Sequence, residues 1–176
     1  SALYMLNTSK NLLTEFHRRA LYYSLFHSYL QYGVLLWGAA SKSLKHPLQI
    51  KQNKAIRCVT GSVYNASALP LFRNTEIPTL DDLYNIELSK FMYLHYSNQL
   101  PTPLMAIFVS NDQVHSHVTR HHDDPHILFR NSQISRNSFV VKGPELWLSL
   151  PDNIKNSMSI YSFKSNIKKM LISKYI

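Results

Sequence analysis

No charged residue occurs between Arg19 and Lys42, and this uncharged run constrains the fold more than any other feature of the sequence. A bilayer-spanning helix needs about 20 apolar residues, so the run is long enough to cross a membrane. However, it contains His27 and Gln31, and its tyrosines are scattered rather than gathered at the two ends. Basic residues flank it on both sides, which sets no membrane orientation. The run therefore predicts a buried core element in a protein with no membrane partner.

Apolar residues recur along the first part of the chain at steps of three and four, which is the spacing of one helical face. The pattern predicts a helix over residues 12–30, with Arg18 and Arg19 off the apolar stripe and directed toward solvent or a ligand. A kink or turn is expected between Gly33 and Gly38. The predicted stripe consists of Leu13, Phe16, Ala20, Tyr23, Phe26 and Leu30.

Three further helices are expected, over residues 43–59, 80–96 and 160–174. Thr79, with Asp82 three residues later, resembles a capping box and marks the start of the middle one. That helix is apolar on most sides, which is typical of a central core helix. The helix over 43–59 is expected to pack through Leu44, Leu48, Ala55, Ile56 and Val59.

The fold class that follows is mainly α: a helical bundle, then a loop-rich segment and two short C-terminal helices. Four glycines among 176 residues argue against a glycine-rich β-barrel. Within the loop-rich segment, Phe139, Val140 and Val141 favour a short strand, and Pro144 suits the first position of the next helix. We expect four segments: a basic helical segment, a continuation of the helical core, an irregular histidine-rich segment and a C-terminal helical segment, over residues 1–61, 62–109, 110–142 and 143–176.

Positive charge is concentrated near the beginning of the sequence. The chain has a net charge of +9, and residues 1–60 contain eight basic side chains against the single acid Glu15. Such a polarised surface favours a polyanionic partner, because lysine and arginine on helix faces neutralise phosphates without reading sequence. Ordinary solvation of helix faces explains the same charges and stays open. The candidate nucleic-acid contacts are Arg18, Arg19, Lys51, Lys54 and Arg57.

Catalytic signatures are mostly missing from the sequence. It has no glycine-rich phosphate loop, no nucleophile elbow and no zinc-protease helix motif. Asp81 and Asp82 fall in a first helical turn, where acids complement the helix dipole, and the pair at 123–124 is interpreted as a solvated loop. Cys58, the single cysteine, excludes a disulfide partner and a cysteine-rich zinc module. Its apolar helical neighbours predict a buried structural thiol.

A histidine cluster offers an alternative chemistry. Imidazoles close together, completed by Asp123 or Asp124, could ligate zinc or copper. Since vicinal loop residues usually point apart and no cysteine supports the site, polar loop histidines are the preferred interpretation, with a metalloprotein kept as an alternative. The cluster consists of His115, His117, His121, His122 and His126.

Several sequence runs together resemble one family. They are YYSLFHSYLQYGVLLWG, QIKQNKAIRCVTG, VHSHVTR and GPELWLSLP, with PLFRNTEIPTLDDL between the second and the third. Their order resembles the C-terminal part of the reverse transcriptase of non-LTR retrotransposons, the jockey-like long interspersed elements. The resemblance covers essentially the whole chain. It departs from the family at Leu148, where asparagine is usual, and at Ser28, where proline is common.

The resemblance implies that this chain follows the catalytic palm. In that family the catalytic aspartates and their Mg²⁺ belong to the upstream fingers and palm, so the chain would hold the helical thumb and its extension, without a cofactor and inactive alone. The thumb grips the template–primer duplex through its backbone, and the upstream fingers and palm of the same polyprotein are the expected second partner. By this likeness Lys51, Lys54 and Arg57 are the first choice for duplex contacts, ahead of Arg18 and Arg19. Arg120 is a weaker candidate without an assigned role.

Two expectations complete the interpretation. We expect an intracellular, nuclear location. The alternative function is a non-catalytic structural or protein-interaction helical module, the remnant of a mobile element, in which tyrosines and lysine faces serve protein contacts.

Overall fold

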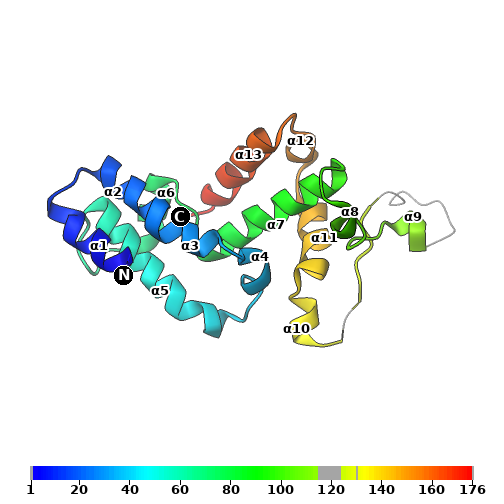
Figure 1. The fold of residues 1–176 in the computed structure, drawn as a ribbon, viewed down its shortest axis with the longest axis horizontal. Coiled ribbons are helices and arrows are strands. Elements are labelled where there is room, and N and C mark those ends of the chain that lie inside the picture. The colour runs from blue at the N-terminus through cyan, green and yellow to red at the C-terminus, as the bar shows by residue number, and fades with distance from the viewer. Residues whose placement is uncertain (1, 115–123, 130, 176) are drawn as a thin grey trace. The chain divides into compact units, whose positions relative to one another are not determined.

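The computed structural model describes residues 2–114, 124–129 and 131–175 (Figure 1). It confirms the mainly α fold, since the described residues form helices and no strand beyond an isolated antiparallel bridge between Ser110 and Pro125. The chain divides into two compact units, one made of Ser1–Tyr84 with Lys168–Ile176 and the other of Asn85–Ile167. The expected division into four segments stays a prediction.

The first unit is built around helix α5. This helix contacts α1, α2, the π-helical segment η2 and α6. The unit also includes the first turn of α7 and the last residues of α13. Its elements are α1 (Ala2–Thr8), the 3-10 helix η1 (Ser9–Asn11), α2 (Glu15–Leu21), η2 (Tyr22–His27), α3 (Ser28–Gln31), α4 (Val34–Trp37), α5 (Lys42–Thr60), α6 (Ala68–Thr75), α7 (Leu80–Tyr96) and α13 (Ile160–Ile172).

The apolar stripe predicted for residues 12–30 is wrong in its first half. Phe16 is 77% exposed, and the buried face instead consists of side chains four residues apart. The cause is the π-helical segment, in which the Ser28 N–H donates to the carbonyl of Tyr23, five residues earlier. A π-turn is wider than an α-turn, so Tyr22 and Phe26, four residues apart within this segment, both point inward. The buried residues are Arg18, Tyr22, Phe26, Leu30 and Val34.

The expected packing of α5 is confirmed at its C-terminal half only. Ala55, Ile56 and Val59 are fully buried, whereas Leu44 is 75% exposed. The first turns of α5 extend beyond α1 and α2 in Figure 1, and Leu44, which lies in these turns, is exposed. Helical periodicity predicted the extent of α5, but it could not predict how far along α5 the neighbouring helices pack.

Gly38 lies after α4 in close contact with the ring of Tyr84. A Cβ atom there would come within 2.4 Å of the Tyr84 Cδ2 atom. Because the buried ring would have to move, Gly38→Ala is expected to lower the free energy of unfolding by about 2 kcal/mol. Gly143→Ala is the comparison: its Cβ would meet the Met92 Sδ atom at 2.9 Å and the Phe108 ring at 3.3 Å, so a smaller loss of about 1 kcal/mol is expected, because a thioether shifts more easily than a buried ring. Urea unfolding followed by circular dichroism measures both, and equal losses would contradict this account.

Tyr175, after α13, is hydrogen-bonded to the start of α7. The Tyr175 hydroxyl donates to the Asp82 carboxylate and accepts a hydrogen bond of 2.9 Å from the Thr79 N–H. Arg73 of α6 donates to the Tyr175 carbonyl at 3.3 Å. The Asp82 N–H donates to the Thr79 hydroxyl oxygen at 3.4 Å, which confirms the capping interaction expected from the sequence, and the Thr79 hydroxyl donates to the Asp82 carboxylate at 2.7 Å. The C-terminal residues therefore complete the first unit.

The second unit has an aromatic core centred on the rest of α7. Tyr96 stacks on Trp147 with ring centroids 4.8 Å apart, and Tyr93 stacks on Phe163 at 4.5 Å. The Tyr93 hydroxyl donates to the carbonyl of Ser157 at 2.9 Å. The remaining elements of this unit are α8 (Thr102–Met105), α9 (Asn111–Val114), α10 (Gln133–Arg136), α11 (Phe139–Ser149) and α12 (Asp152–Lys155), followed by most of α13.

Two local expectations in this unit are wrong. Phe139, Val140 and Val141 form the first turn of α11 rather than a strand, and Pro144 lies inside that helix rather than at its first position. The reason is tertiary packing: the Phe139 ring contacts the Phe91 ring of α7 edge-on, with centroids 6.1 Å apart, and Val141 is 4% exposed. Burial on a helix surface overrides the strand propensity of these side chains.

No described helix is long and apolar enough to span a membrane. The uncharged run between Arg19 and Lys42 instead forms η2, α3 and α4, which supply buried residues to the first unit.

Candidate nucleic-acid interface

Helix α5 carries a basic face opposite a buried one. Lys51, Lys54 and Arg57 follow one another at three-residue steps, so neighbouring members of the row are adjacent on the helix surface. Lys51 is exposed, and the other two are half-buried. The buried face consists of Gln52, Ala55, Ile56 and Val59, each 0% exposed. The core thus fixes the rotation of α5 and holds its basic face outward.

The basic row has no acidic partner among the described residues. Lys54 lies over the ring of Tyr64, with Nζ 5.9 Å from the centroid, and Arg57 donates through Nε to the carbonyl of Ala66 at 2.8 Å. Ion pairs in the described part of the chain involve other cations, and Lys51, Lys54 and Arg57 belong to none of them. The row therefore keeps its full positive charge for a ligand.

Other basic side chains of α5 and α2 are differently engaged. Lys45 forms an ion pair with Asp81 at 2.5 Å, which neutralises both groups. Arg19, in the last turn of α2, is half-buried, with its guanidinium carbon 6.0 Å from the centre of the Tyr23 ring. The structure gives Arg19 no contact with the α5 row.

The expectation that Arg18 lies toward solvent or a ligand is wrong. Its side chain is 9% exposed and donates through Nε to the carbonyl of Val59 at 2.8 Å, in the last turn of α5. Its Nη1 atom donates to the carbonyls of Lys10 and Leu13 at 2.6 and 2.7 Å. Gly61 ends α5 in the left-handed conformation with φ 73°, directly beside this guanidinium. Arg18 therefore holds the end of α5 against the turn after α1.

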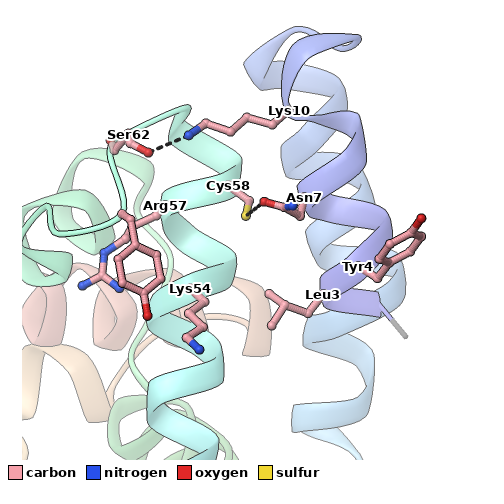
Figure 2. Close-up of a pocket in the computed structure, with 9 residues that line it drawn as sticks. Leu3, Tyr4, Asn7, Lys10, Lys54, Arg57, Cys58 and Ser62 are labelled. Atoms are coloured by element: carbon pink, nitrogen blue, oxygen red, sulfur yellow. Dashed lines mark hydrogen bonds between the residues drawn. The ribbon is translucent and has the colours of Figure 1, made fainter.

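Sequence reasoning missed two residues that the structure brings to the basic row. A cavity of about 410 Å³ lies between α1 and α5, and Lys10 and Tyr64 line it together with Lys54 and Arg57 (Figure 2). Lys10, in the 3-10 helix η1 that follows α1, donates to the carbonyl of Ser62 at 2.7 Å. The short helix α1 was not expected from the sequence, so no signal placed Lys10 beside α5.

Cys58 is buried, as the sequence predicted. It is 8% exposed, and its Sγ donates to the Asn7 side-chain oxygen at 3.7 Å (Figure 2). Burial raises the pKa of its thiol above the usual value, an effect that the nearby charges of Lys10 and Arg18 oppose. A thiol in its protonated form is a poor nucleophile, which agrees with a structural role.

The other candidate groups are only partly described. Asp81 and Asp82 lie in the first turn of α7, which confirms their interpretation as first-turn acids. Arg120 and Asp123 lie outside the described residues, as do four histidines of the cluster, His115, His117, His121 and His122. Within residues 2–114, 124–129 and 131–175, no three metal-ligating side chains gather as they would around an ion.

Similarity to a known protein agrees with the resemblance. Over 82 residues the chain is 28% identical to a Drosophila melanogaster protein described as a probable RNA-directed DNA polymerase from transposon BS. This chain is similar to part of a transposon polymerase. The match covers 47% of this chain and 9% of the length of that relative. No protein-family model matches the chain, and no solved structure matches it either.

Proposed function

We propose that this chain is a nucleic-acid-binding, thumb-like part of an RNA-directed DNA polymerase, which grips a template–primer duplex through its phosphate backbone. The row Lys51, Lys54 and Arg57 carries the proposal, because it presents three cations without a carboxylate partner among the described residues. Similarity to a transposon polymerase supplies the class of ligand. Arg19 is a second candidate contact, whereas the buried Arg18 is left out of the proposed interface.

The rest of the proposal concerns the protein around this chain. Polymerisation and Mg²⁺ binding belong to an upstream fingers and palm, to which the chain would be joined, and the place of action is the nucleus. Binding through phosphates alone does not read base sequence, so duplexes of different sequence should bind equally well.

The test is the salt dependence of duplex binding by the full chain. A labelled RNA–DNA hybrid is titrated at several salt concentrations, with fluorescence anisotropy as the measurement. Each phosphate contact contributes about 0.9 to the slope of log affinity against log salt. The variant K51A/K54A/R57A is therefore expected to flatten the slope by about 2 to 3 and to weaken binding by more than about tenfold at low salt.

A matched variant removes three lysines that already contact acids. Lys142, Lys155 and Lys164 lie near Glu145, Asp152 and Glu87, at 2.6, 3.5 and 3.5 Å. Their replacement by alanine removes the same formal charge, yet the slope should change by less than about 1, because their partners already neutralise them. Equal changes of the salt slope in the two triple variants, or wild-type affinity that does not depend on salt, would refute the proposed interface.

A further inference from the structure

The cavity between α1 and α5 combines a cationic rim with an apolar floor. Lys10, Lys54 and Arg57 supply the cations, Leu3 and Cys58 supply apolar surface, and none of the described residues that line it is acidic. Its volume of about 410 Å³ falls in the range of small-ligand sites. In Figure 2, Leu3 projects from α1 toward α5, and Lys10 closes the upper end of the gap by reaching Ser62. The cavity therefore matches a ligand that is anionic at one end and flat or apolar at the other.

The cations of the rim are held in place without being neutralised. Lys10 is anchored by the Ser62 carbonyl, and Arg57 by the Ala66 carbonyl through Nε alone. The two terminal nitrogens of Arg57 have no hydrogen-bond partner in the described part of the chain. A carbonyl oxygen fixes the position of a cation without cancelling its charge. Such an arrangement suits a phosphate, which accepts several hydrogen bonds at once.

Tyr64 adds an aromatic surface beside this anion site. It lines the cavity, is 75% exposed, and carries Lys54 over its ring at 5.9 Å. Bases of single-stranded nucleic acids stack on such rings while basic groups hold the neighbouring phosphates. A base inside a duplex is already stacked on its neighbours, so its faces are not accessible to Tyr64. The ligand that uses both the ring and the cations is thus an unpaired nucleotide.

We propose that this cavity binds one unpaired nucleotide, with the base against Tyr64 and the phosphate among Lys10, Lys54 and Arg57. The inference rests on the proposed function, because Lys54 and Arg57 belong both to the duplex-binding row and to the cavity. It adds that the chain distinguishes the single-stranded extension of a template–primer from its paired region. Lys51, which does not line the cavity, serves the duplex alone.

The experiment compares two hybrids that differ only in an unpaired extension. One RNA–DNA hybrid is blunt, and the other carries an extension of about four nucleotides. The full chain is expected to bind the extended hybrid about tenfold more tightly, since stacking of one base on an aromatic ring has an effect of this size. Tyr64→Ala should remove this gain, measured as the ratio of its affinities for the two hybrids, while Tyr64→Phe, which keeps the ring, should retain the gain.

Competitors distinguish the strand from a free nucleotide. Adenosine monophosphate supplies base and phosphate together, so it should reduce the gain from the extension, whereas inorganic phosphate at the same concentration should not. Tyr32→Ala is the control for loss of an exposed tyrosine, because Tyr32 is 85% exposed and does not line the cavity. This variant should bind both hybrids as the wild type does.

The outcomes separate this inference from the proposed function. Equal affinity for the blunt and extended hybrids, with a normal salt slope, overturns the nucleotide site and leaves duplex binding intact. Equal losses in Tyr64→Ala and Tyr32→Ala, or equal competition by inorganic phosphate, also overturn the site. Failure to bind either hybrid overturns the proposed function together with the inference. Circular dichroism of each variant verifies that the helical fold is retained.

Discussion

Replacing Arg18 by methionine is expected to lower the free energy of unfolding by about 4 kcal/mol, although methionine keeps most of the buried volume. The guanidinium donates three hydrogen bonds to the carbonyls of Lys10, Leu13 and Val59. Hydrogen bonds from a charged donor contribute about 1.5–3 kcal/mol each, and the abandoned carbonyls would be left without that partner in a nearly closed site. Urea unfolding followed by circular dichroism gives the change as a shift of the midpoint.

The neighbouring arginine provides the control. Arg19→Met removes the same charge from the same helix, but Arg19 is half-buried, makes no hydrogen bond or ion pair with the described residues, and lies over the ring of Tyr23 at 6.0 Å. Its loss should change stability by less than about 1 kcal/mol. Arg18→Lys keeps the charge, but an ammonium group cannot reach all three carbonyls as the planar guanidinium does. It should therefore lose slightly less stability than Arg18→Met. Comparable losses at both arginines would show that charge, rather than the hydrogen bonds, is responsible.

Gln52→Leu is expected to destabilise the chain by about 3 kcal/mol, despite replacing a polar side chain by an apolar one in the core. Gln52 is 0% exposed and donates to the Tyr22 hydroxyl at 3.1 Å and to the Pro78 carbonyl at 3.0 Å. Its own oxygen accepts a hydrogen bond of 3.0 Å from Gln49. Leucine fills the space but leaves these buried groups without their amide partner. The loss of hydrogen bonds destabilises the fold by more than the added apolar contact stabilises it.

A double-mutant cycle tests whether the hydrogen bond to Tyr22 contributes to this loss. Burial raises the pKa of the Tyr22 hydroxyl far above its usual value, so the group stays neutral and accepts the hydrogen bond from the Gln52 amide. Tyr22→Phe should cost about 1 kcal/mol alone and almost nothing in the Gln52→Leu background. Additive losses would contradict the coupling. Gln99→Leu, at an exposed position, should leave the urea midpoint unchanged.

The sequence predicted the helices whose apolar residues follow a regular α-helical period. Helix α7 has the bounds expected for it, and α5 differs from its expectation by one residue at each end. The basic row of α5 could be predicted for the same reason, since three-residue spacing on a helix fixes which side chains are neighbours. Short elements such as α1 and α6 carry too few residues for a period to be recognised, so they were missed.

The errors at Arg18 and Lys10 have one physical origin. Arg18 has the residue type of a surface position, yet its side chain is buried on α2, where its Nε donates to the carbonyl of Val59, 41 residues away. Lys10 becomes part of the candidate site only through the packing of α1 on α5. Both placements depend on contacts between segments far apart in the sequence, and such contacts leave no local periodic pattern.

The attachment of Tyr175 to Thr79 determines the order in which the nascent chain can fold. The two residues are 96 positions apart, and all of the second unit is synthesised between them. At translation rates of about 5–20 residues per second, the first unit waits about 5–20 seconds for its final segment. The second unit can fold during this interval. The start of α7 meanwhile lacks its hydrogen bonds with Tyr175 and is accessible to chaperones. The first unit is therefore completed only after the second unit has been translated, even though most of the first unit is translated early.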